Sequence, residues 1–182
     1  MDTLVKSFDY SSFITAEDIN AAIGDIDKII DSGNYFTNSP RFQTKENIFA
    51  LQGEHWLKLR MTFLTSVFAY FGQELRVGNM MAWCFKTNKS TEEDRNTYWH
   101  HHNKHSGQSM SGIMYLRIPD DVTDLSTCGT EMAPNGPEGD NKYFVGPNNM
   151  TWNVYPSQTW HRPGPAQSEN WRYVLAVDVD YF

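Results

Sequence analysis

The 182-residue chain has little cysteine, an excess of acidic over basic residues and no long apolar run. Its two cysteines, Cys84 and Cys128, are too few for a disulfide scaffold and form no C-x-x-C motif, so we expect a reducing compartment and no role for either thiol in chemistry. A net charge of -7 argues against non-specific binding to nucleic acid. No apolar run approaches the roughly 20 residues of a membrane span, and the first residues lack the pattern of a signal peptide. We therefore expect a cytoplasmic protein that does not bind membranes, with its oligomeric state left open.

The length predicts one domain, 1–182, with a helical support region at 1–76 and a β-rich core at 77–182. The first helix should begin after the cap Thr15 and end near Gly33. Apolar residues at helical spacing mark this helix and a second one. These residues are Ile19, Ile23, Ile26 and Ile30, and then Trp56, Leu59, Phe63, Val67 and Tyr70.

From about Val77 the residue pattern changes to short apolar segments separated by glycine, proline and asparagine. The predicted strands are "MMAWCF", "SGIMYLRIP", "TWNVYP" and "WRYVLAVDVDYF", and the predicted turns are "PNGPEGDN" and "VGPNN". Strands of this kind after two helices favour a mainly β fold. We expect a double-stranded β-helix, or jelly roll, with the helices packed on one sheet.

Four of the six histidines lie in the segment "NTYWHHHNKHSG". In an extended chain, residues two apart point to the same side, so His100 and His102 could face one metal while His101 faces away. The third ligand would then come from a distant strand, and the candidate is His161 in "SQTWHRPGP". The alternative is a solvated loop after the charged segment "NKSTEEDR", and the residues alone leave both readings open.

Several segments in a fixed order resemble the core of the Fe(II)/2-oxoglutarate-dependent oxygenases, in their prolyl-hydroxylase-like branch. These segments are "WHHHN", "SGIMYL", "GTE" and "YPSQTWHRPGPAQSENWRYVLAV", and the resemblance covers about Met80 to Phe182. It implies a jelly roll that binds Fe(II) and uses 2-oxoglutarate as co-substrate. It also implies that Arg172, eleven residues after His161, and Tyr115 hold the far carboxylate of the co-substrate.

Strand alternation supports these two assignments without the family. If Arg172 points inward, Val174 and Ala176 line the barrel, while Tyr173, Leu175 and Val177 pack against the helices. In the other strand Ser111, Ile113 and Tyr115 share one face, and Met114 and Leu116 share the other. A guanidinium and a phenol are suitable partners for a buried carboxylate.

The chain departs from the family at one metal ligand, the usual Asp or Glu. If His100 is the first ligand, His102 occupies that place, and if His101 is the first, Asn103 occupies it. Three interpretations remain. His100, His102 and His161 could bind the metal as three imidazoles, which we prefer. Glu131 could supply the carboxylate from a neighbouring strand. The motif could also have decayed, leaving a fold that only binds.

The expected activity is that of an Fe(II)/2-oxoglutarate-dependent dioxygenase that hydroxylates an unidentified small molecule or peptide, with succinate and CO2 as co-products. One alternative is a three-His, cupin-like dioxygenase that does not use 2-oxoglutarate. Another is a non-catalytic jelly roll with a closed Zn or Ni site. His105 is assigned to the loop or to substrate contact, and Lys86–Tyr98 is a lid or a solvated connection.

Overall fold

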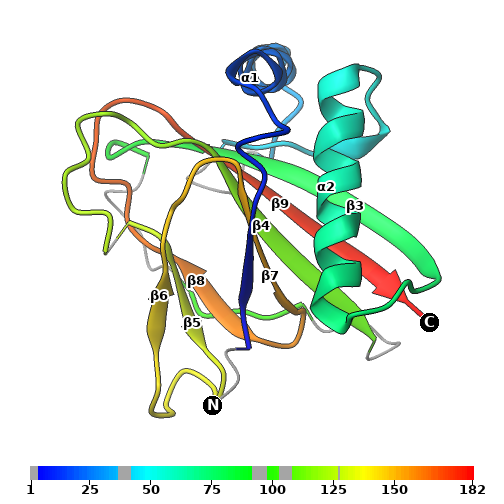
Figure 1. Ribbon diagram of the computed structural model, residues 1–182. Coiled ribbons are helices and arrows are strands. Elements are labelled where there is room, and N and C mark those ends of the chain that lie inside the picture. Colours follow the sequence, from blue (N-terminus) through cyan, green and yellow to red (C-terminus); the bar gives the residue numbers. More distant parts are fainter. Residues whose placement is uncertain (1–3, 37–41, 92–97, 103–107, 127) are drawn as a thin grey trace.

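Two antiparallel sheets of unequal size face each other, and two α-helices cover the outer face of the larger sheet (Figure 1). This computed structural model describes residues 4–36, 42–91, 98–102, 108–126 and 128–182. The arrangement confirms the predicted jelly roll with helices on one sheet. The helices are α1 (Ala16–Asp31), the 3-10 turn η1 (Ile48–Ala50) and α2 (Glu54–Phe71).

The larger sheet has six strands, and the smaller sheet has three. In spatial order the six are β1 (Lys6–Asp9), β7 (Thr151–Pro156), β4 (Ser109–Arg117), β9 (Arg172–Tyr181), β3 (Val77–Thr87) and β2 (Phe42–Gln43). The three are β6 (Tyr143–Val145), β5 (Thr130–Ala133) and β8 (Trp160–Pro163). The four predicted strands correspond to β3, β4, β7 and β9, which are neighbours in the larger sheet. Residues 1–76 contribute its two edge strands as well as the helices.

Helix α1 begins where the sequence predicts. Thr15 and Asp18 form a capping box, in which the Thr15 side chain accepts from the Asp18 backbone and the Asp18 carboxylate accepts from the Thr15 backbone. Lys58 of α2 donates to both carboxylate oxygens of Asp18, at 3.0 and 3.1 Å. The cap therefore also joins the two helices.

Helix α2 packs closely on the larger sheet through Phe63 and Trp152, whose rings lie 5.0 Å apart. The glycine of the "SGIMYL" segment permits this approach, since a Cβ at Gly112 would overlap the Phe63 ring. The predicted apolar stripe of α2 is buried at Trp56, Leu59, Phe63 and Val67.

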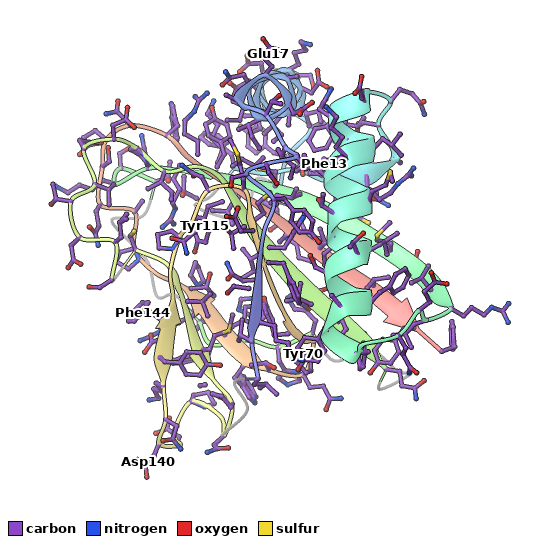
Figure 2. The ribbon with its side chains drawn as sticks, viewed as in Figure 1. Phe13, Glu17, Tyr70, Tyr115, Asp140 and Phe144 are labelled. Atoms are coloured by element: carbon purple, nitrogen blue, oxygen red, sulfur yellow. The ribbon has the colours of Figure 1, made fainter. Side chains whose placement is uncertain are left out.

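Alternation along β9 and β4 separates the core from the interior between the sheets. Tyr173, Leu175 and Val177 join the core cluster that includes the helices, as do Met114 and Leu116 of β4. Ile113 and Tyr115 belong to a second cluster with Met132 of β5. The predicted face assignments are confirmed, and Tyr115 lies in the interior between the two sheets (Figure 2).

Both cysteines are free thiols and buried. Burial raises the pKa of Cys84, which keeps this thiol protonated. Within the described residues, no helix combines the length and the apolar composition needed to cross a bilayer.

Replacing Gly112 with Ala should destabilise the protein by about 1 to 3 kcal/mol, because the new methyl group would force α2 away from β4. The matched control is Gly24→Ala in α1, where no atom lies within 4 Å of the added Cβ. That change should stabilise by about 0.5 to 1 kcal/mol through helix propensity. Urea unfolding of both variants measures the two effects, and equal free energies of unfolding would contradict the packing described here.

The cap of α1 should make stability depend on pH. Burial alone would raise the pKa of Asp18, but the hydrogen bonds from Thr15 and Lys58 outweigh it and lower the pKa below its ordinary value of 3.8. A carboxyl whose pKa falls on folding stabilises the fold at higher pH, and this contribution is lost as the pH falls through the folded-state pKa.

Asp18→Asn should therefore lower the free energy of unfolding by about 1 kcal/mol at pH 7 and by clearly less near pH 3. Urea unfolding at the two pH values measures the difference, with Glu17→Gln in the same helical turn as the control. A loss that is the same at both pH values would show that the charge of Asp18 does not contribute.

Candidate metal centre

Two histidines far apart in the sequence lie directly opposite each other. The His100 backbone N–H donates to the His161 carbonyl at 3.1 Å, and the His161 N–H donates to the His100 carbonyl at 2.9 Å. This reciprocal pair is an antiparallel bridge that adds the segment around His100 to the edge of β8. Another backbone bond, from His102 to the Ser157 carbonyl, holds the segment two residues further on.

The imidazoles of His100, His102 and His161 converge at this bridge. Each offers a donor atom, and these atoms all lie within 4.8 Å of one another. His161 is buried, His102 is half-buried and His100 is exposed. His101 turns the other way and packs edge-on against Trp160, with ring centroids 4.4 Å apart, as the strand alternation predicted.

Oxygen atoms next to each ring fix which imidazole nitrogen faces the centre. Nδ1 of His161 lies 2.8 Å from the Thr159 carbonyl, and Nδ1 of His100 lies 3.2 Å from the Tyr98 carbonyl. Nδ1 of His102 lies 2.8 Å from a carboxylate oxygen of Asp178. These oxygens can only accept, so in the neutral rings Nδ1 carries the proton and Nε2 keeps a lone pair. Three lone pairs held in this way suit a first-row transition metal.

His161 is held neutral. Its burial, followed by the nearby imidazoles of His100 and His102, lowers the pKa of His161 to about 3. Only a neutral imidazole can bind a metal, so His161 needs no deprotonation near neutral pH.

A cavity of about 610 Å³, partly open to solvent, adjoins the three histidines. Both sheets line it. Aromatic rings enclose the histidines, with Trp83 centred 5.6 Å from His102 and Tyr155 centred 5.2 Å from His161.

Arg172 and Tyr115 line the same cavity as the three histidines. Arg172 is 4% exposed, and its Nη1 donates to the carbonyls of Cys128 and Gly164 at 3.0 and 3.1 Å. Its Nε donates to the hydroxyl of Thr87 at 3.2 Å, and the Tyr115 hydroxyl lies 2.9 Å from that of Thr130. A buried cation and three hydroxyl groups thus form a polar end of the cavity.

Glu131 lies on the other face of the small sheet. In the register of β5 with β8, Met132 is opposite His161 and Glu131 is opposite Arg162, so Glu131 and His161 point to opposite sides. Its carboxylate accepts from Nε of Arg162 at 2.6 Å. Among the described residues, the group of potential ligands around His161 contains only His100 and His102.

Sequence reasoning missed Asp178, a buried carboxylate of β9 beside His102. The signal was available, because Asp178 has the same strand parity as Arg172 and so faces the interior. His105 and residues 92–97 of the possible lid lie outside the described residues.

No family model and no curated sequence matches the chain, whereas solved structures share its fold. A prolyl-4-hydroxylase of Pseudomonas putida superposes with a TM-score of 0.68 at 14% identity, over 98% of this chain and 93% of that one. A Trichoplax adhaerens prolyl hydroxylase, solved with a hypoxia-inducible-factor peptide fragment, gives 0.67 at 11% identity over 98% and 84%. The α-ketoglutarate-dependent epimerase SnoN of nogalamycin biosynthesis gives 0.71 at 10% identity over 97% and 76%. The chain therefore has the fold of these two hydroxylases and of this epimerase.

We expect each of His100→Ala, His102→Ala and His161→Ala to weaken binding of Co(II), a spectroscopic substitute for Fe(II), by at least about a hundredfold, because each removes one of three ligands. Glu131→Gln is the control and should bind as the wild type does, since it faces away from the centre. Anaerobic titration followed by visible absorbance gives the affinities. Retained affinity in His161→Ala, or a loss in Glu131→Gln, would contradict this ligand set.

Proposed function

We propose that the protein is an Fe(II)/2-oxoglutarate-dependent oxygenase that hydroxylates a C–H bond of a small molecule or peptide. The observation that carries the proposal is that three convergent imidazoles and a buried arginine line the same cavity. The shared fold with prolyl hydroxylases, one of them solved with 2-oxoglutarate and one with a peptide, supports it. The cysteine content and acidic charge support a cytoplasmic location without nucleic-acid binding.

In this proposal His100, His102 and His161 hold the iron through Nε2. When bound, the iron with 2-oxoglutarate and dioxygen supplies the oxidising power for hydroxylation, and succinate and CO2 are the co-products. Because only three residues would hold the metal, it would keep positions open for the co-substrate and dioxygen. The carbonyl of Thr159 keeps the imidazole of His161 in the tautomer that binds metal, and the carbonyl of Tyr98 does the same for His100.

Arg172 binds and orients the co-substrate at the polar end of the cavity. Its guanidinium is fixed in place by hydrogen bonds to backbone carbonyls, so little side-chain entropy is lost when an anion binds. Tyr115 and Thr130 add hydroxyl groups at the same end. A dicarboxylate held there by one end can present its 2-oxo acid end to the histidines.

The apolar part of the lining limits access of water to the reacting atoms. Trp83, Phe85 and Val174 come from β3 and β9 and line the cavity between the histidines and the polar end. These large side chains exclude water, so electrostatic interactions in the site are stronger than in solution.

A three-His dioxygenase that does not use 2-oxoglutarate is the second candidate, favoured by the absence of a carboxylate among the three convergent donors of the described residues. Such an enzyme would have no need of Arg172. Dependence of metal-site absorbance on 2-oxoglutarate separates the two, and a closed structural site would show no exchangeable position to either compound.

Arg172→Ala should weaken 2-oxoglutarate binding to the Fe(II)-loaded protein by about 2 to 5 kcal/mol, because a desolvated carboxylate would lose its charged partner. Arg172→Lys should fall between Ala and wild type, since an ammonium supplies charge without the planar fork. Tyr115→Phe should cost about 1 kcal/mol, as for one hydrogen bond. Anaerobic titration of 2-oxoglutarate, followed by the charge-transfer absorbance of the chelated 2-oxo acid, measures all three.

The matched control is Arg162→Ala, which removes an arginine of β8 that pairs with Glu131 outside the cavity. It should leave 2-oxoglutarate affinity unchanged, and Fe(II) binding should survive in every variant. A wild type with no charge-transfer band, or an Arg172→Ala variant that binds 2-oxoglutarate as tightly as wild type, would refute the oxygenase proposal.

A further inference from the structure

Asp178 lies next to His102, the candidate ligand that stands where the family has Asp or Glu. Its Oδ1 is 2.8 Å from Nδ1 of His102, on the side of the ring opposite Nε2, and the residue is 5% exposed. Asp178 does not belong to the convergent donor group, so it touches a ligand without being one.

Hydrogen bonds hold this carboxylate in place. Ser111 Oγ donates to Asp178 Oδ1 at 2.6 Å and lies 2.9 Å from Ser157 Oγ. The Ser157 carbonyl in turn accepts from the His102 backbone at 2.8 Å. Ser111 and Asp178 are direct cross-strand partners in β4 and β9, which sets their separation.

Charge explains why such a carboxylate would be needed. Three imidazoles are neutral, so they offset none of the charge of a divalent ion, and unbalanced charge is costly where a site is shielded from water. A carboxylate hydrogen-bonded to the outer nitrogen of a ligating histidine fixes the ring orientation and makes the ring a stronger ligand.

We propose that the His102–Asp178 pair takes the place of a directly bound carboxylate, with Asp178 supplying the negative charge through the imidazole of His102. Asp178 is thus a positioning residue for the metal centre. This inference rests on the metal site of the proposed function but not on its co-substrate or its reaction.

The test is the same substitution, Asp178→Asn, in two backgrounds. In the wild type it keeps the size of the side chain and removes its charge, so Co(II) affinity should fall about 10- to 100-fold. In His102→Asp, a carboxylate occupies the ligand position itself and stands near Asp178. There Asp178 has no imidazole to act through, so Asp178→Asn should lower Co(II) affinity by much less than it does in the wild type.

This dependence on His102 separates a role through the imidazole from packing. A purely structural role for Asp178 would weaken Co(II) binding by the same factor in both backgrounds, and that result would overturn the inference, as would unchanged affinity in the wild-type background. Asp180→Asn, two residues along the same face of β9, is the matched control and should leave Co(II) affinity unchanged. Thermal unfolding of the metal-free variants shows whether each is folded at the temperature of the titration.

The outcome for the proposed function is read separately. If Co(II) binds and the effect of Asp178→Asn depends on His102 while Fe(II)-loaded protein does not bind 2-oxoglutarate, the oxygenase proposal fails and the inference about Asp178 stands. If the wild type binds neither Co(II) nor Fe(II), both fail.

Discussion

The reciprocal backbone hydrogen bonds between His100 and His161 are the constraint on which the site depends. They join a segment that precedes β4 to the edge strand β8, and they place two imidazoles on the same side with ring centroids 4.3 Å apart. Backbone pairing fixes positions to a fraction of an ångström, which flexible loops do not. Once these two rings are in place, the alternation of an extended chain brings His102 to the same centre and sends His101 to the outer side.

Strand β9 contributes to stability and to the site through its two faces. Leu175 and Val177 pack against the helices in the main core, whereas Arg172 lines the cavity and Asp178 contacts His102. Because β9 is hydrogen-bonded to β4 and β3 along both edges, the strand sets the distance between the Cα atoms of Arg172 and Asp178. The separation between the polar end of the cavity and the metal centre therefore depends on the fold, and on the hydrogen bonds that hold the two side chains.

The sequence predicted those parts of the structure that depend on local patterns. The cap at Thr15, the apolar stripe of α2 and the faces of β4 and β9 follow from periodicity alone. The position of Glu131 depends on the register of β5 with β8, and two strands of four residues carry too little pattern to set a register. Asp178 was missed for a different reason: Glu131 was the only distant carboxylate considered as a partner of the histidines, although the strand parity used for Arg172 also applied to Asp178.

Because the three candidate ligands are neutral, the contributions of the metal and of Arg172 to binding a 2-oxo acid would change. Near three imidazoles a divalent ion keeps its full charge, and Asp178 offsets that charge only from beyond the His102 ring. Coulomb attraction falls with distance, so the ion would attract the 2-oxo acid end more strongly here than where a carboxylate binds it directly. More of the co-substrate's affinity would then come from the metal and less from Arg172. Removing the charge of Asp178 would accordingly weaken the metal's hold on the protein while strengthening its hold on the co-substrate, two effects of opposite sign from one residue.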